Sequence, residues 1–142
     1  MIDIYNMVFT KLYDRLHSEY PDANISDRYD EQTAVFPCIT IMEIDNVPLR
    51  RTVTDDNSEN HSTIRYEIAV YSDKLDTAKS EIRKILGTVD DVMRNDMKFR
   101  RIRVNQPINI ARTIYRQYAR YEVIVAEPLV IDDNTVYQMY RR

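Results

Sequence analysis

The stretch TIRYEIAVYS, residues 63–72, decides the fold class of this 142-residue chain. Its large apolar side chains come at every second position, at Ile64, Tyr66, Ile68 and Val70. Successive side chains of a β-strand point to opposite faces of a sheet, so this alternation predicts a strand with one buried face. The neighbouring elements must supply the layer that covers this face.

An amphipathic helix is predicted before this strand, over residues 3–20. Its apolar side chains recur at spacings of three and four from Tyr5 to Leu16, which places them on one helical face. Asp3 is expected to cap the first turn, because its carboxylate can accept a hydrogen bond from a free backbone N–H. Pro21 is expected to end the helix within a residue or two.

A second amphipathic helix is predicted after the strand, over residues 75–93. Ser72 or Asp73 can cap its start. Gly87 is the only glycine of the chain and falls inside this helix, at a cost of about 1 kcal/mol relative to alanine. We therefore expect either a close approach of helix and sheet at Gly87 or a small break there.

The region before residue 63 predicts two more strands. Residues 36–44 are almost continuously apolar, which favours a central strand. Asp45-Asn46 and Pro48 predict a turn, and residues 49–54 predict a more polar strand after it. Residues 22–34 are polar, and we expect them to be extended or looped.

Strands are also predicted after the second helix, over residues 99–104, 114–126 and 129–137. A turn signal at residues 132–134 interrupts the last of them. The order of elements indicates an α+β fold in one domain, residues 1–142. We expect a single mixed or antiparallel sheet of about five to six strands, with two helices packed on one face.

Few side chains are placed for catalysis or metal binding. One glycine is too few for the common phosphate-cradling loops. Neither His17 nor His61 has a second ligand at metal-binding spacing, and we expect both at the surface. Cys38, the only cysteine, is expected to be a buried thiol, with a Cys–His pair across the fold left open as a hydrolase alternative. We therefore expect no enzymatic activity, no catalytic or metal site and no cofactor.

The polar segment at residues 55–62 contains no apolar side chain. Its first oxygen-bearing residues resemble the start of a calcium loop, but Asn60 and Tyr66 stand where such a loop requires glycine and glutamate. We expect a solvated loop, either mobile or ordered by a partner. The candidate contact residues in this loop are Asp55, Asp56, Asn57, Ser58, Glu59 and Asn60.

Charge is divided unevenly along the chain, although the net charge is only −3. Residues 94–120 hold eight basic residues and one acid, a charge of +7, and the remaining chain holds twelve basic and twenty-two acidic residues, a charge of −10. A chain polarised in this way can attract copies of itself or a polyanion.

Arginines and tyrosines share faces of the basic strands. Strand alternation places Arg101 and Arg103 on one face with Phe99, and Arg116, Tyr118 and Arg120 on one face of the long strand. Three interpretations stay open: a solvated outer face, a contact with another subunit or partner, and a nucleic-acid-binding module over residues 98–120.

The sequence also bears on where the chain works. No apolar run approaches the ~18 residues of a membrane span. The N-terminus lacks the basic and apolar regions of a signal peptide. We expect the chain to be made in the cytoplasm and to have no membrane partner.

Four stretches together resemble the tail terminator proteins of long-tailed bacteriophages and prophages, including copies labelled minor tail or minor capsid components. They are residues 36–41 after the first helix, residues 66–72 after the polar loop, residues 89–93 followed by Phe99-Arg100-Arg101, and residues 114–116 running into 120–123. Head–tail joining and tail completion proteins look alike at this level. Relatives often carry glycine before the Phe-Arg pair, where this chain has Met97-Lys98.

The resemblance implies a structural virion protein rather than an enzyme. Such a subunit forms a homo-oligomeric ring, commonly a hexamer, that caps the tail tube and joins it to the head connector. DNA passes through the ring without specific binding, and the polar loop would contact the tube.

Overall fold

The computed structural model describes residues 1–49, 61–126, 129–131 and 134–141. The helices are α1 (Tyr5–Glu19) and α2 (Ala78–Asp91), and a π-helical turn (Val92–Asp96) extends α2. The strands are β1 (Asn24–Ser26), β2 (Cys38–Pro48), β3 (His61–Ser72), β4 (Arg100–Val104), β5 (Ile108–Ala111), β6 (Ile114–Ala126), β7 (Leu129–Ile131), β8 (Asn134–Val136) and β9 (Met139–Tyr140).

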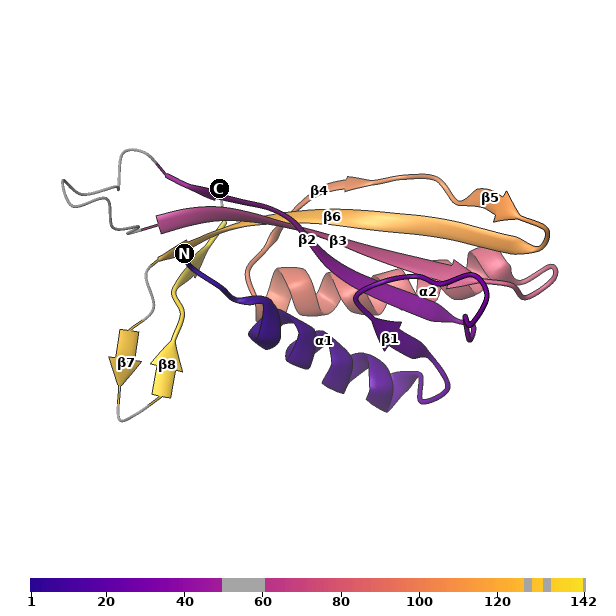
Figure 1. Ribbon diagram of the computed structural model, residues 1–142, viewed down its shortest axis with the longest axis horizontal. Coiled ribbons are helices and arrows are strands. Elements are labelled where there is room, and N and C mark those ends of the chain that lie inside the picture. The colour runs from indigo at the N-terminus through magenta and orange to yellow at the C-terminus, as the bar shows by residue number, and fades with distance from the viewer. Residues whose placement is uncertain (50–60, 127–128, 132–133, 142) are drawn as a thin grey trace.

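One mixed sheet organises the molecule, in the order β1-β2-β3-β6-β4. β1 runs parallel to β2, and the other pairings are antiparallel. The long strand β6 pairs with β3 along one side and with β5, β4 and β9 in succession along the other. β7 and β8 form a separate two-stranded hairpin beyond the end of β6 (Figure 1).

Both helices cover the same face of the sheet, and the other face carries no helix (Figure 1). The alternating pattern that predicted β3 places its apolar side chains under the helices, fully buried. The sheet side of the core comprises Ile39, Ile41, Ile64, Tyr66, Ile68, Val70, Tyr121, Val123 and Val125, and the helix side comprises Val8, Leu12, Leu16, Ile82, Ile85 and Val89. The predicted fold class, α+β with two helices on one face of the sheet, is confirmed.

The ends of α1 agree with the sequence, with one difference at its start. Asp3 lies before the N-cap residue Ile4, but its carboxylate accepts a hydrogen bond of 3.0 Å from the backbone N–H of Tyr5. The helix ends at Glu19, directly before Tyr20 and Pro21. Asp3 therefore supports the first turn without occupying the N-cap position.

The start of α2 and the role of Gly87 were predicted wrongly. The α-helix begins at Ala78, and Leu75 is 73% exposed instead of contributing to the buried stripe. The Ser72 hydroxyl donates to Glu81 and so does not cap the helix. Gly87 lies on the exposed side, and a Cβ built on it would meet nothing within 4 Å. Neither a close approach nor a break explains this glycine.

The turn predicted at residues 45–48 is also wrong, because β2 continues to Pro48. A β-bulge at Ile44 absorbs the irregularity, and Asp45 and Asn46 pair with Arg65 and Ile64 of β3. Pro48 is tolerated at the end of an edge strand, where its missing N–H removes little. The strand predicted over residues 49–54 lies almost wholly outside the described residues.

Short strands fill segments for which the sequence predicted no strand. β1 lies within the polar segment 22–34, and β5 lies between the predicted strands 99–104 and 114–126. The strand predicted over residues 129–137 is divided between β7 and β8. Each of these strands has only three or four residues, too few for a periodic pattern.

Candidate interaction surface

The helix-free face of the sheet, here called the open face, is lined by arginine, glutamate and tyrosine. Four side chains that alternate along β6 point to it: Arg116, Tyr118, Arg120 and Glu122. Their β3 neighbours on this face are Arg65, Glu67, Ala69 and Tyr71, as the alternation in both strands predicted. Of the predicted contact residues, the open face therefore brings Arg116, Tyr118 and Arg120 together.

The ring of Tyr118 lies among three guanidinium groups. The guanidinium carbons of Arg120, Arg116 and Arg103 lie 4.9, 5.1 and 5.9 Å from the ring centroid. Cations within about 6 Å of an aromatic ring are attracted to its negative face. Tyr118 thus concentrates positive charge at one point of the open face.

Glu67 partly neutralises this cluster. Its carboxylate lies 2.6 Å from a guanidinium nitrogen of Arg116 and 3.6 Å from one of Arg120. Arg116 also donates a 3.1 Å hydrogen bond to the Tyr71 hydroxyl. Burial acts to lower the pKa of Arg116, but the bonds to Tyr71 and Glu67 outweigh it and raise the pKa, so Arg116 stays charged. Arg103 and Arg120 remain the more exposed cations.

A second charge cluster on the open face is built around Glu122, whose side chain is 2% exposed. Arg100 of β4 lies 2.7 Å from its carboxylate and Arg65 of β3 lies 3.3 Å from it, so the three side chains cross three adjacent strands. Burial acts to raise the pKa of Glu122, but hydrogen bonds and charge from Arg100 and Arg65 bring the pKa below its ordinary value. The cluster holds β4 against β6 and β3.

Arg101 does not share a face with Arg103, contrary to the strand alternation. A β-bulge leaves Ile102 unpaired, so Arg101 lies opposite Tyr121 on the helix face and Arg103 lies opposite Arg120 on the open face. Arg101 instead approaches Asp90 of α2 at 3.3 Å, and the same carboxylate accepts a 2.9 Å hydrogen bond from the Tyr121 hydroxyl. The predicted set of five contact residues is therefore divided between two faces, with Arg101 alone on the helix side.

Cys38 and the two histidines lie far apart. Cys38 is 1% exposed beneath the open face, and burial raises the pKa of its thiol despite a contact from Asn24. It pairs with Tyr71 at one end of β3, whereas His61 lies at the other end, about 33 Å away at 3.3 Å per residue. His17 stacks on Tyr13 along α1, on the opposite side of the sheet. The Cys–His hydrolase alternative therefore has no structural basis in the described residues.

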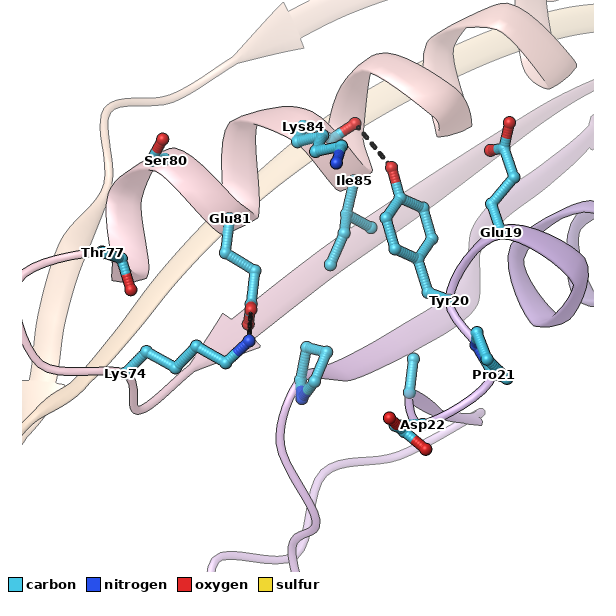
Figure 2. A pocket seen from close by; sticks show the side chains of 12 residues that line it. Glu19, Tyr20, Pro21, Asp22, Lys74, Thr77, Ser80, Glu81, Lys84 and Ile85 are labelled. Carbon is cyan, nitrogen blue, oxygen red and sulfur yellow. Dashed lines mark hydrogen bonds and ion pairs between the residues drawn. The ribbon is translucent and has the colours of Figure 1, made fainter.

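A shallow pocket of about 420 Å³ lies where α1 ends and α2 begins. Figure 2 shows Tyr20 pointing across it to α2, where its hydroxyl lies 3.3 Å from the Lys84 carbonyl. Lys74 and Glu81 form an ion pair on the same wall (Figure 2). Tyr20 therefore joins the end of α1 to α2 across this pocket.

The predicted contact loop, Asp55 to Asn60, lies outside the described residues. Within the ranges that the structure describes, three or more histidine, cysteine or carboxylate side chains nowhere gather at metal-binding distance. No helix of the described part is long and apolar enough to cross a bilayer. A comparison of the sequence with known protein families and with curated proteins found no match.

The structure adds two open sheet edges that the sequence did not predict. Among the described residues, β2 has a partner on its outer side only at residues 38–40, and β4 has β6 alone as its partner. Each edge carries a β-bulge whose unpaired residue is an isoleucine, Ile44 or Ile102. In the sequence, each isoleucine stands between two charged residues of one sign, in Glu43-Ile44-Asp45 and in Arg101-Ile102-Arg103. Only the pairing of the strands shows that both triplets lie at edges of the sheet.

Proposed function

We propose that this protein is a structural subunit of a bacteriophage or prophage tail, forming a homo-oligomeric ring that caps the tail tube and joins it to the head connector. The observation that carries the proposal is the separation of charge across the sheet. Arginines collect on β4 and β6, whereas the segment around β1 and the outer edge of β2 carries acids. Such a subunit presents opposite charges to its two neighbours in a head-to-tail ring.

The open face supports a role in contact with other proteins. Arginine and tyrosine are the residue types enriched at protein interfaces, and here they form a rigid cluster held by Glu67 and Tyr71. A preorganised cluster loses little conformational freedom when a partner binds. We assign this face, with Tyr118 and Arg120, to contact with a tail or connector protein.

The biological setting comes from the family resemblance. The resemblance to tail terminators supplies the tube, the connector, the virion location and the expected hexamer, with head–tail joining and tail completion as related roles. It also supplies a non-catalytic subunit without cofactor, through which DNA passes without specific binding. The chain departs from the resemblance at Met97-Lys98, where relatives often carry glycine, although Lys98 adopts a φ of 63°, a conformation that favours glycine.

The experiment that tests the proposal is electron microscopy of the purified protein, alone and with tail tubes purified from the same phage or prophage. We expect rings with a central opening, and the same rings at one end of each tube. The open-face variant Arg120→Glu, in which the changed residue lies off both sheet edges, should still form rings if this face binds the partner, but these rings should no longer bind to the ends of the tubes. Tubes that stay bare in the presence of wild-type rings would contradict the capping role.

A nucleic-acid-binding module is the second candidate, favoured by the exposed Arg103 and Arg120 beside the ring of Tyr118. Phosphates could pair with the arginines while a base stacks on an aromatic ring. Two observations weaken it: Glu67 already pairs with Arg116 and Arg120, and Arg101 lies on the other face. A gel-shift titration at low salt decides between the candidates, since a nucleic-acid module requires binding that falls steeply with added salt.

A further inference from the structure

We infer that copies of this chain join edge to edge, with the outer edge of β2 in one copy pairing with the outer edge of β4 in the next. This inference rests on the proposed ring and names the surface that builds it. The β2 edge comprises residues 42–48, and the β4 edge comprises residues 100–104. The occupant of each edge is a second copy of this chain.

Both edges can accept a further strand. Edge strands present a row of N–H and C=O groups that can template further pairing. Many proteins make such an edge polar throughout, but here apolar side chains remain exposed along both. The exposed fractions are 46% for Met42, 39% for Ile44 and 49% for Val47 on one edge, and 42% for both Ile102 and Val104 on the other. Pairing would remove this apolar surface from water.

The two edges carry side chains of opposite charge. The β2 edge carries Glu43 and Asp45 on either side of its bulged isoleucine, and the β4 edge carries Arg101 and Arg103 on either side of its own. Two β2 edges, or two β4 edges, would place like charges opposite each other, which destabilises a pair of strands. Unlike edges attract, so the charges select head-to-tail contact and disfavour a symmetric dimer.

The directions of β2 and β4 also fit a contact between these two edges. β2, β3, β6 and β4 are joined by three antiparallel steps, so β2 and β4 run in opposite directions within one subunit. In a ring whose axis runs along the strands, rotation preserves these directions. The β2 edge of one copy then meets the β4 edge of the next in an antiparallel arrangement, and all helices stay on one side of a continuous sheet.

The sheet face on which each charged side chain lies limits the possible pairing registers between the β2 edge and the β4 edge. Glu43 and Arg101 both lie on the helix face, because they pair with Tyr66 and Tyr121. Asp45 and Arg100 both lie on the open face, because they pair with Arg65 and Glu122. One antiparallel register places Glu43 opposite Arg101. Because Ile44 is bulged out and unpaired, the next paired residue on β2 is Asp45, which then lies opposite Arg100. In that register Ile44 and Ile102 are diagonal neighbours across the contact, at about 7–8 Å.

Site-directed cross-linking tests this contact. In a Cys38→Ala background, the single variants Ile44→Cys and Ile102→Cys are mixed and treated with a short bis-maleimide. We expect a cross-linked dimer in the mixture and little in either variant alone, since each variant alone carries cysteine on one edge only, and that edge meets an edge without cysteine in the neighbouring copy. The double variant Ile44→Cys, Ile102→Cys should give a ladder that closes at the ring number. Circular dichroism checks that each variant is folded.

The controls separate this contact from the ring itself. Leu75→Cys mixed with Val35→Cys, two exposed positions away from both edges, sets the background of random collisions. If wild-type rings form but the mixture of Ile44→Cys and Ile102→Cys gives only this background, the edge contact is wrong and the proposed function stands. If the chain stays monomeric, the ring fails as well. Dimers from Ile44→Cys alone would overturn the head-to-tail arrangement.

Discussion

Ile44 in β2 and Ile102 in β4 occupy equivalent positions at two different edges of the sheet. Each is the unpaired residue of a β-bulge, and their exposed fractions are 39% and 42%. Acids flank Ile44 and arginines flank Ile102. Two matched but oppositely charged edges in one chain are what head-to-tail assembly requires.

Charge placed at one of these isoleucines should weaken self-association. In Ile102→Glu a carboxylate would be buried at the proposed contact, and we expect the association constant to fall by about tenfold or more. The opposite charge in the double variant Ile44→Lys, Ile102→Glu should restore most of the loss. Sedimentation velocity measures both effects. Leu75→Glu, at an exposed position away from the edges, should associate like the wild type, and an equal loss there would contradict the assignment.

Glu122 should couple the stability of the fold to pH. Its pKa is below the ordinary value of 4.5, so its stabilising effect is full above about pH 4.5 and is lost as the pH falls through the lower folded pKa. Glu122→Gln removes the charge that Arg100 and Arg65 share, and should lower the free energy of unfolding at pH 7 by about 1–3 kcal/mol. Its unfolding should also depend less on pH below pH 4.5.

The matched control for Glu122 is Glu19→Gln. Glu19 pairs with Arg15 at 3.4 Å, but both side chains are 40% exposed. An exposed pair of this kind contributes roughly 0–1 kcal/mol. Urea denaturation of the two variants at pH 7 and at pH 3 checks the difference. Equal behaviour of the two variants would show that the burial of Glu122 has no energetic effect.

Gly87→Ala should stabilise the protein by about 1 kcal/mol, because the position is helical, exposed and free of neighbours within 4 Å. Thermal unfolding measures the change as an increase in Tm. A lower Tm would mean that Gly87 is required for a contact outside the isolated subunit. Either sign is informative, since the fold alone gives no reason for glycine here.

Lys98→Gly should also stabilise the protein, for a different reason. Lys98 connects the π-helical turn to β4 with a φ of 63°, a conformation that costs a residue with a Cβ roughly 1–2 kcal/mol. Lys84→Gly is the matched control, since the same change inside α2 should destabilise by about 1 kcal/mol. Chemical denaturation should give opposite signs for the two variants, and a destabilised Lys98→Gly would contradict the backbone assignment.

The sequence predicted those parts of the fold in which alternation runs without interruption. β3 and β6 have twelve and thirteen residues, and the predicted faces of Arg116, Tyr118 and Arg120 are correct because no bulge interrupts their pairing with β3. Asp90 and Asp91 are neighbours in the sequence but contact different elements from α2: Asp90 reaches Tyr121 and Arg101, whereas Asp91 pairs with Arg15 of α1.

The sequence failed where one residue changes the register. The bulge at Ile102 moved Arg101 to the helix face, and the bulge at Ile44 let β2 continue through the predicted turn. A bulge depends on the partner strand, and no local pattern in Arg101-Ile102-Arg103 distinguishes it from regular alternation. For the same reason the open edges could not be predicted, since an edge is defined by the strands that are missing beside it.

Self-assembly is the claim on which the function depends, and the mass of the purified protein in solution tests it most directly. Light scattering over a wide range of concentrations should show a mass that rises from one chain to a single larger multiple and then stays constant, as a closed ring requires. A mass that remains that of one chain at the highest concentration would contradict a ring-forming subunit. A mass that grows without limit would contradict a closed ring.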